Sequence, residues 1–329
     1  MKKIALVTGA AGALGPLLVD GLLKAGYLVK VLVRNKPVKN VFNDAVTIVT
    51  GDITNKEDVD NAVNGVNLVF HLAAKLHVND PDPSLEKEYY RVNVDGTRLV
   101  TEACLNMGVA RIIFFSTIAV YGDNNDKGIF YESSPLNPCS FYAESKKQAE
   151  DIVLKADTGI VLRVGAVYGS RMKGNYRTLF SAVQNGWFIP FGKGTNRRTL
   201  VFQDDLVRAA ILVAEHPKAV GQVYNVTDGA VHTLDDILSA MYRAAGKSKP
   251  RVYLPEKTVR FMAGIGDRIS SLAGRKQPIL TKMVKKLFED VAVGGEKIEK
   301  ELEFKAEYNL LQGWLDTAAS WDCKRKLKF

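Results

Sequence analysis

The chain has 329 residues, of which 47% are hydrophobic and 25% charged, as in ordinary soluble globular proteins with a large core. The apolar run of the opening MKKIALVTG breaks at Gly9, and no run of about 18 apolar residues follows, which argues against a secretory signal and a membrane span. Three scattered cysteines and four histidines lack disulfide or metal-ligand spacing, so neither a disulfide framework nor a metal site is expected. We therefore expect a cytoplasmic protein.

The net charge of +9 is concentrated in one part of the chain. Between Arg243 and Lys286 the sequence has twelve lysines and arginines against two acids, Glu256 and Asp267. Such a segment is typical of proteins that contact nucleic acid, an anionic membrane or a polyanionic substrate, and it is equally typical of a solvated face. The basic end at 324–329 has the length of a disordered terminus, so we expect no nucleic-acid partner. Peripheral contact with a membrane stays open as an alternative.

Strand-like apolar runs alternate with helical patterns along the first two-thirds of the chain. Helical periods at 16–26 and 96–108 are each closed by glycine. The predicted strands are residues 4–9, 27–34, 45–52, 68–74, 111–117 and 159–169. This alternation predicts an α/β fold in which helices cover both faces of a parallel sheet.

The pattern changes after Gly169. Residues 170–198 are loop-rich and polar, 199–229 return to strand and helix patterns, and the sequence from Leu234 onward is mostly helical. We therefore predict two lobes and a tail. The first lobe comprises 1–169 plus 199–229, the second comprises 170–198 plus 230–323, and the basic tail is 324–329.

Three glycines, Gly9, Gly12 and Gly15, follow the first predicted strand in the stretch VTGAAGALGP. Glycines in such a turn let the backbone approach a pyrophosphate, and the helix N-terminus behind them offers free N–H groups with a partial positive charge. Pro16 suits the first helical turn, where its missing N–H costs little. The turn therefore predicts a dinucleotide-binding first lobe.

The second predicted strand ends in Leu32-Val33-Arg34-Asn35-Lys36, without an acid. An acid at this point accepts a hydrogen bond from the ribose 2′-hydroxyl of NAD, whereas an arginine accommodates the 2′-phosphate of NADP. Arg34, supported by Lys36, therefore favours NADP. The alternative is a surface arginine beside bound NAD.

Tyr142 and Lys146 lie four residues apart in a predicted helix and so share one face. A phenol with a pKa near 10 becomes a base near neutrality only if its pKa falls by about three units, which a nearby ammonium and an oxidised nicotinamide would favour. Tyr253 and Lys257 repeat the spacing, but Pro255 between them breaks a helix. We interpret that second pair as chance.

Ser116 and Thr117 end the predicted strand 111–117, at the edge where open α/β sheets bind ligands. We predict that Thr117 hydrogen-bonds the reacting oxygen and that Ser116 supports it. Plain strand-capping hydroxyls are the alternative.

Several motifs, taken in order, resemble the extended short-chain dehydrogenase/reductase family, which includes UDP-galactose 4-epimerase, sugar-nucleotide dehydratases and 4-ketoreductases. They are TGAAGALG, GDIT at 51–54, HLAA at 71–74, NVDGT at 93–97, STIAVYG, YAESK, LRVGAVYG and RTLVFQDDL. The resemblance covers nearly the whole chain. It implies a Rossmann-like doubly wound parallel sheet with a smaller, mostly helical C-terminal substrate lobe. It also implies NAD or NADP as cofactor, a nucleotide-sugar substrate and a homodimer that uses the helix of Tyr142.

The resemblance assigns roles to individual residues. Tyr142 would be the catalytic base and Lys146 its partner, and Thr117 would match the catalytic Ser/Thr of the family. Cofactor contacts would come from Gly9, Gly12, Ala13, Leu14, Gly15, Arg34, Asp52, Ile53, Ala73, Ala74, Asn93, Ser116, Tyr142 and Lys146. Substrate contacts would come from Thr117, Asn175, Phe191 and Arg198, the last because a guanidinium binds phosphate oxygens bidentately.

Two positions depart from the family pattern. Ala166 stands where 4-epimerases usually have asparagine, and Val33-Arg34 stand where NAD-retaining epimerases usually have aspartate. Both departures favour a reductase or dehydrogenase that exchanges NADP(H), without excluding an epimerase.

Three functions follow from these observations. The leading interpretation is an NAD(P)-dependent oxidoreductase or epimerase that acts on a nucleotide-activated sugar, with Tyr142 as acid/base. Within the same family, the alternative is a reductase or dehydrogenase of an apolar, steroid-like ketone or alcohol, whose pocket the apolar stretch 187–191 would line. A third interpretation, from another class, is a non-catalytic dinucleotide-sensing scaffold. The presence of Thr117, Tyr142 and Lys146 together argues against the scaffold.

Overall fold

A computed structural model describes residues 2–35, 41–76, 83–124, 128–272, 281, 284 and 289–326. A seven-stranded, wholly parallel sheet in the order β10-β6-β5-β4-β1-β2-β3 forms its centre. The strands are β1 (Ile4–Thr8), β2 (Leu28–Val33), β3 (Thr47–Thr50), β4 (Leu68–His71), β5 (Arg111–Thr117), β6 (Gly159–Val164) and β10 (Val223–Val226). The chain runs outward from β1 to β3 and then, from β4, in the opposite direction. Ligands in open α/β sheets bind where this order reverses, at the carboxyl ends of β1 and β4.

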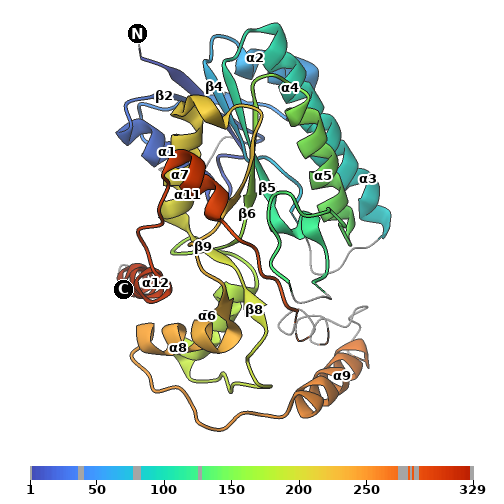
Figure 1. The fold of residues 1–329 in the computed structure, drawn as a ribbon, viewed down its shortest axis with the longest axis vertical. Coiled ribbons are helices and arrows are strands. Elements are labelled where there is room, and N and C mark those ends of the chain that lie inside the picture. Colours follow the sequence, from blue (N-terminus) through green and yellow to red (C-terminus); the bar gives the residue numbers. More distant parts are fainter. Residues whose placement is uncertain are drawn as a thin grey trace.

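Helices cover both faces of the sheet (Figure 1). One face carries α1 (Gly15–Lys24), α7 (Gln203–Glu215) and α11 (Glu296–Leu302), and the other carries α2 (Lys56–Val63), α4 (Gly96–Asn106) and α5 (Phe141–Leu154). Alternate side chains of β5 serve the two cores, with Ile113 and Phe115 on the first face and Ile112 and Phe114 on the second. The predicted Rossmann-like parallel sheet is confirmed.

Short helical segments connect the main elements near the carboxyl edge of the sheet. They are η1 (Pro83–Leu85), α3 (Glu86–Tyr89), the π-helix η2 (Tyr90–Asp95), η3 (Ile118–Tyr121) and η4 (Pro217–Ala219). The π-helix lies directly before α4, in the segment that carries Asn93. Single π-turns of this kind often occur at functional sites.

The stretch 159–169, predicted as one strand, forms two. β6 ends at Val164, and β7 (Ala166–Tyr168) leaves the sheet to pair with β9 (Leu200–Phe202). Gly165 lies between them, where a Cβ atom would come within 3.2 Å of the Thr199 carbonyl oxygen and 3.3 Å of the Val226 carbonyl oxygen. The close approach of two other backbone segments therefore explains both the glycine and the break.

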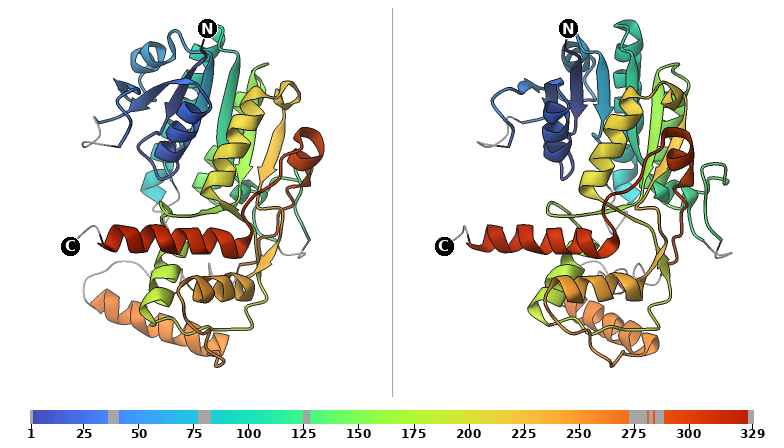
Figure 2. Two further views of the ribbon diagram at one scale, coloured as in Figure 1. Left: turned by 90° about the vertical axis from the view of Figure 1, so that its left-hand side faces the viewer. Right: turned by 60° about the vertical axis from the view of Figure 1, so that its left-hand side comes forward.

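A second core lies beyond the carboxyl edge of the sheet. It is built by α6 (Asn175–Asn185), α8 (Leu234–Ala244) and α12 (Leu310–Lys326), with β8 (Arg197–Arg198) pairing antiparallel to β11 (His232–Thr233). Trp314 of α12 is its centre, with ring centroids 4.9 Å from Tyr168 and 5.0 Å from Phe180. Figure 2 shows α12 between the sheet above and α6, α8 and α9 (Glu256–Leu272) below.

The two cores refine the division into lobes that we propose. Ile298, Leu302 and Phe304 pack in the core of the sheet, so 296–304 belong with the first lobe, although the predicted boundaries placed them in the second. The predicted tail also changes, because α12 continues to Lys326, while 327–329 lie outside the described residues. None of the helices in the described part of the chain has the length and apolar content that crossing a bilayer requires.

Candidate functional site

The glycine turn after β1 leaves no room for side chains. Gly9 has φ +69°, and a Cβ atom on it would lie 2.6 Å from the Ala73 backbone nitrogen. A Cβ atom on Gly15 would overlap the carbonyl group of Ala10, and one on Gly12 would lie 3.1 Å from the Gly9 oxygen. The turn is therefore a cradle closed on its protein side by β1 and the loop after β4.

The N-terminus of α1 opens onto this cradle. Leu14 is the N-cap residue and makes no capping hydrogen bond through its side chain, while Pro16 occupies the first turn. The first N–H groups of a helix lack intrahelical partners, and together with the helix dipole they bind anions. The residues present thus fit the pyrophosphate of a dinucleotide, with Ala13 and Leu14 in the turn that would contact it.

The predicted adenosine contacts lie at the ends of β2 and β3. Arg34 is exposed directly after β2, and Lys36 lies outside the described residues. The Asp52 carboxylate accepts hydrogen bonds from the backbone N–H (2.9 Å) and hydroxyl (3.0 Å) of Thr54, which fixes the loop after β3. Ile53 is buried against Gly96 at the start of α4, where a Cβ atom would lie 2.9 Å from the Ile53 side chain. Asp52 and Ile53 therefore shape this loop from within.

Asn93 ties the loop after β4 to the helix of Tyr142. Its side chain accepts from the Lys75 N–H (2.7 Å), and it donates to the Lys75 carbonyl (3.2 Å) and to the Ser145 hydroxyl (2.9 Å). Ser145 in turn donates to the Tyr142 carbonyl at 2.8 Å. Ala73 and Ala74 lie in this loop, half-buried, and the Ala73 N–H donates to Thr8 at 3.2 Å. The contacts give Asn93 a positioning role that the motif alone did not reveal.

His71, at the end of β4, links the same region to β1. Its imidazole is fully buried and hydrogen-bonds the hydroxyls of Thr8 (2.7 Å) and Thr97 (2.9 Å). Burial, together with the charge of Lys146, lowers the pKa of His71 to about 3. The ring is therefore neutral near neutral pH, and it joins β1, β4 and α4 beneath the glycine turn.

Tyr142 and Thr117 are brought together at the carboxyl edge. Tyr142 lies in the first turn of α5, whose N-cap residue Ser140 accepts from the Ala143 N–H at 3.2 Å. Its phenol is hydrogen-bonded to the Thr117 side chain, and its ring packs edge-on against Tyr89 at 6.4 Å between centroids. The fold therefore brings the phenol and the strand-end threonine together at this edge of the sheet.

Lys146 lies one turn further along α5 and is almost completely buried. Its ammonium nitrogen is 3.8 Å from the centroid of the Phe114 ring. Burial lowers the pKa of Lys146 to about 7, against the opposing effect of the Glu150 carboxylate. Burial also raises the pKa of Tyr142 to about 12, although the Thr117 hydrogen bond acts in the other direction. In the protein itself, desolvation thus outweighs the fall in the Tyr142 pKa expected from the sequence.

A buried polar network supports this pair, and sequence reasoning missed it. Glu150 forms an ion pair with Arg163 at 2.8 Å, and Ser116 donates a short hydrogen bond to the same carboxylate. Arg163 also donates to the Tyr121 hydroxyl (3.0 Å), which donates to the Asn225 side chain (2.7 Å). Ser116 therefore supports α5 from below. The position of Glu150, four residues after Lys146, was the one available signal.

Apart from Thr117, which ends β5, the predicted substrate residues lie in the second lobe. Asn175 is the first residue of α6, and Arg198 lies in β8 opposite His232. Phe191 is buried and pairs with Leu254, with its ring 5.7 Å from that of Phe188. The other part of the apolar stretch faces outward, since Trp187 is 82% and Ile189 51% exposed. Of the apolar stretch 187–191, only Phe188, Pro190 and Phe191 therefore remain as candidates for a pocket lining.

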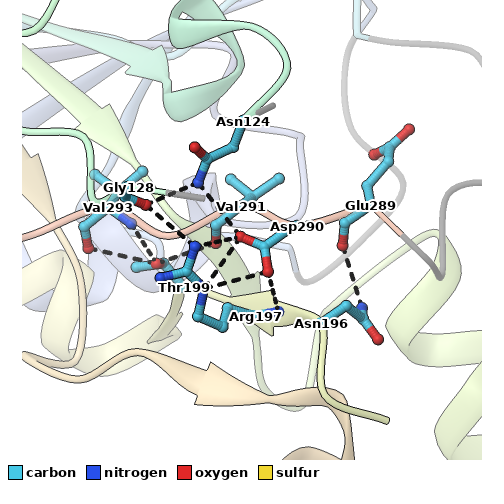
Figure 3. A network of polar contacts seen from close by, with 9 residues as sticks. All are labelled: Asn124, Gly128, Asn196, Arg197, Thr199, Glu289, Asp290, Val291 and Val293. Atoms are coloured by element: carbon cyan, nitrogen blue, oxygen red, sulfur yellow. Dashed lines mark hydrogen bonds and ion pairs between the residues drawn. The ribbon is translucent and has the colours of Figure 1, made fainter. Parts of the chain in front are cut away.

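Arg197, next to Arg198 in the chain, is held in a structural network (Figure 3). Its guanidinium binds the Asp290 carboxylate at 2.7 and 3.1 Å and the Gly128 carbonyl at 3.2 Å. Asn124 donates to the same carboxylate at 3.3 Å. Thr199 accepts from the Val293 N–H at 2.9 Å. The segment 289–293 thereby joins β8 to the loop after η3.

A cavity of ≈ 900 Å³ lies next to this network. Its walls are residues 192–197 and 253–256, together with Arg260 and Asp290. The volume lies in the range of small-molecule sites. Tyr253, the first half of the repeated tyrosine–lysine spacing, precedes α9 and donates to Asp235 at 2.7 Å. The interpretation of that second pair as chance agrees with this placement outside a helix.

Comparison with known proteins matches this arrangement to an established family. Residues 5–227 fit the sequence model of the NAD dependent epimerase/dehydratase family. The chain is 29% identical, over 95% of its length and 93% of the relative's, to an N-acetyl-alpha-D-glucosaminyl-diphospho-ditrans,octacis-undecaprenol 4-epimerase of Escherichia coli O157:H7. It is 33% identical to a UDP-glucose 4-epimerase of Vibrio cholerae, over 78% of this chain and 79% of that one.

The fold agrees as well. A UDP-glucose 4-epimerase of Thermotoga maritima, solved with UDP-glucose, superposes with a TM-score of 0.78 at 23% identity, covering 98% of this chain and 99% of that one. Within the part of the chain that the structure describes, no cluster of three or more side chains is suited to hold a metal ion.

Proposed function

This chain belongs to the NAD-dependent epimerase/dehydratase family, and we propose that it epimerises the C4 carbinol of a sugar joined to a diphosphate. Membership makes it an enzyme and removes the scaffold interpretation. The observation that carries the proposal is the hydrogen-bonded pair of Thr117 and Tyr142, with Lys146 one helical turn away on the same face of α5. The two 4-epimerases among its relatives support the choice of reaction.

The cradle formed by Gly9, Gly12 and Gly15 would hold NAD across the carboxyl edge of the sheet. Bound there, NAD would supply the capacity to take up a hydride from a carbinol carbon and to return it. Tyr142 would take the carbinol proton and give it back, and Thr117 would donate a hydrogen bond to the same oxygen. Lys146, with a pKa of about 7, gains and loses a proton readily near neutrality, so its ammonium form can stabilise the phenolate of Tyr142.

The proposed substrate class is defined by the diphosphate. One relative acts on a sugar linked through diphosphate to undecaprenol, and the other on a sugar linked to a nucleoside diphosphate. Arg198 would bind the phosphate oxygens and Asn175, at the start of α6, would contact the group beyond them. We therefore propose a sugar diphosphate whose second substituent is either a nucleoside or a polyprenol.

The direct test uses enzyme reconstituted with NAD. UDP-glucose, UDP-N-acetylglucosamine and N-acetylglucosaminyl-diphospho-undecaprenol are incubated with it, and the C4 epimers are quantified by NMR. We expect interconversion of at least one substrate, and loss of it in Tyr142→Phe. If the protein binds NAD but converts none of the three substrates, the proposal is contradicted.

Arg198→Ala separates this proposal from reduction of an apolar ketone. A sugar-diphosphate enzyme loses its phosphate contact, so we expect KM to rise by roughly tenfold or more with a smaller change in kcat. An apolar substrate has no phosphate for Arg198 to bind. Unchanged KM in the variant, with conversion of a steroid-like ketone by the wild type, would favour the reductase.

The preference between NAD and NADP is tested at Arg34. We propose NAD as the working cofactor, with exposed Arg34 able to accommodate a 2′-phosphate. Arg34→Ala should then weaken NADP binding more than NAD binding in calorimetric titrations, and equal loss for both would remove Arg34 from the 2′ site. Gly15→Ala is the reference variant for a blocked cradle, because the added Cβ atom would overlap the Ala10 carbonyl. This variant should bind both NAD and NADP more weakly.

Assembly as a homodimer through the helix of Tyr142 remains part of the proposal. Light scattering of the purified protein measures its mass directly. We expect twice the chain mass of 36.2 kDa. A monomer would contradict this part alone.

A further inference from the structure

We propose that α9 docks the protein on an anionic lipid bilayer. The docking region, the α9 surface, consists of Phe261, Met262, Ile265 and Ile269 with the flanking cations Lys257 and Arg268. This inference stands on the exposure and charge of α9. Its consequence for the substrate, given below, rests on the proposed function.

The apolar side of α9 faces away from the protein. Phe261, Met262, Ile265 and Ile269 are 70%, 58%, 42% and 62% exposed. Their spacing of one, four and eight residues from Phe261 places them on one side of a helix. Helices of soluble proteins turn such a stripe toward the core.

Small and acidic residues occupy the inner side of α9 instead. Ala263 is 6% and Asp267 9% exposed, and the Asp267 carboxylate accepts from the Thr281 N–H at 2.8 Å. The helix is thus oriented with Asp267 inside and its large apolar groups outside. Contiguous exposed apolar side chains on a helix mark an interaction surface.

The charge around the α9 surface identifies an anionic lipid bilayer as the partner that it binds. The cations Lys257 and Arg268 are exposed beside the apolar stripe, and the sequence from Arg243 to Lys286 has twelve basic residues against two acids. Of these acids, Glu256 is paired with Arg260 at 2.7 Å and Asp267 is buried. Apolar residues flanked by lysine and arginine on one helix are the pattern of helices that lie in an anionic membrane interface.

The neighbouring segment has further exposed apolar residues. Trp187 is 82%, Ile189 51% and Val252 71% exposed. The backbone joins these residues to the start of α9, because Leu254 N–H donates to the Pro190 carbonyl and Gly192 N–H to the Leu254 carbonyl, both at 2.9 Å. Tryptophan is enriched at the membrane interface, where its ring meets the headgroups. In Figure 1 and Figure 2, α9 is the element of the second lobe farthest from the sheet, so it is accessible to a flat surface.

Docking would select between the two proposed substrates. A sugar diphosphate anchored in the bilayer by a polyprenol would meet the docked protein at the lipid surface, on the side of the second lobe, which carries Asn175 and Arg198. The α9 surface therefore favours the polyprenol-linked substrate over the nucleotide-linked one.

The test is co-sedimentation of the full chain with vesicles. Vesicles of phosphatidylglycerol mixed with phosphatidylcholine should bind the protein at low salt, with weaker binding at high salt and on pure phosphatidylcholine. In Phe261→Ser/Ile265→Ser, the fraction bound should fall roughly tenfold or more, because two large apolar groups no longer enter the interface. Lys257→Glu/Arg268→Glu should remove binding to the anionic vesicles.

Two matched variants complete the design. Leu105→Ser/Met107→Ser removes exposed apolar side chains, 50% and 40% exposed, from the opposite lobe, and Lys305→Glu reverses an exposed charge there. Both should bind vesicles like the wild type. Equal binding by wild type and the Phe261→Ser/Ile265→Ser variant would overturn the proposal. So would a wild-type oligomer that this variant dissociates, because the occupant of the surface would then be a second copy.

Activity separates this proposal from the proposed function. On a water-soluble nucleotide sugar, Phe261→Ser/Ile265→Ser should match the wild type, whereas on N-acetylglucosaminyl-diphospho-undecaprenol in vesicles it should be slower by roughly tenfold or more. If no substrate is converted but vesicle binding follows the pattern above, the proposed function fails and docking stands. Equal rates of wild type and variant on the vesicle-borne substrate would contradict the link between docking and substrate.

Discussion

The floor of the candidate site is the buried polar region beneath Tyr142 and Lys146, formed by His71, Ser116, Glu150 and Arg163. This floor and the α9 surface arrange charged and apolar groups in opposite ways. Under Tyr142 and Lys146, charged groups are buried and each is satisfied, as in the ion pair of Glu150 with Arg163. On α9, large apolar groups are exposed and an acid is turned inward. Each arrangement costs stability and is retained in the fold. We therefore propose that the first region holds the catalytic residues in place and that the second meets a partner.

The largest expected effect is at Tyr142, and a matched tyrosine controls it. Tyr142→Phe keeps the ring but removes the proton carrier, so kcat should fall by roughly a thousandfold while NAD still binds. Tyr27→Phe removes a hydroxyl that donates to Glu215 at 2.7 Å just before β2, at the edge of the sheet opposite the glycine turn, and it should leave kcat nearly unchanged. Steady-state kinetics measures kcat of both variants, and an equal fall in kcat would contradict the assignment of Tyr142 as acid/base.

Breaking the buried ion pair should have the next largest effect. Glu150→Gln leaves Arg163 without its counterion, which typically costs about 3–5 kcal/mol of unfolding free energy. Asp151→Asn, on the same helix, breaks an exposed pair with Lys147 at 3.5 Å and should cost less than about 0.5 kcal/mol. Urea unfolding compares the two. Similar small losses would show that the network does not fix the floor of the site.

Acid should weaken the floor of the site through His71. Its folded pKa of about 3 lies below the unfolded value of 6.5, so between these values the unfolded chain binds a proton that the folded chain does not. Stability contributed by the neutral ring is therefore complete above pH ~6.5 and is lost by about 1.4 kcal/mol per pH unit as pH falls toward ~3. His71→Gln should unfold with a shallower pH dependence in this window. Parallel curves for the two proteins would contradict the burial of a neutral ring.

The smallest expected effect is on α9, where Gly264 has room for the methyl group of an alanine. Nothing lies within 4 Å of a Cβ atom built on Gly264. Gly264→Ala should therefore stabilise the helix by up to about 1 kcal/mol and leave vesicle binding intact. Thermal unfolding and co-sedimentation check the two readouts. A loss of stability would mean that the inner side of α9 is more tightly packed than the structure shows.

The sheet and the residues at its carboxyl edge could be predicted because local signals determine them. Alternating apolar runs place each strand, and glycine spacing places the turn that faces α1. Tyr142 and Thr117 meet because both lie at the end of an element that the parallel topology brings to one edge. Such features need no knowledge of contacts between distant segments.

Features that depend on distant segments were not predictable. Arg197 and Asp290 are 93 residues apart, and nothing in either stretch announces their pairing. The return of 296–304 to the first core and the break at Gly165 likewise depend on β10 and β9. Around α9, the basic composition left membrane contact open, but the direction in which the apolar side of this helix faces is set by packing and not by the sequence pattern.

The central claim is that the hydrogen on the reacting carbon moves as hydride while Tyr142 moves the hydroxyl proton. Epimerisation in deuterium oxide, followed by NMR of the product, tests it most directly. Hydride held by the enzyme does not exchange with solvent, so the account predicts a product without deuterium at C4, formed by the wild type and not by Tyr142→Phe. Deuterium at C4 of the wild-type product would show proton abstraction from carbon and would contradict the account.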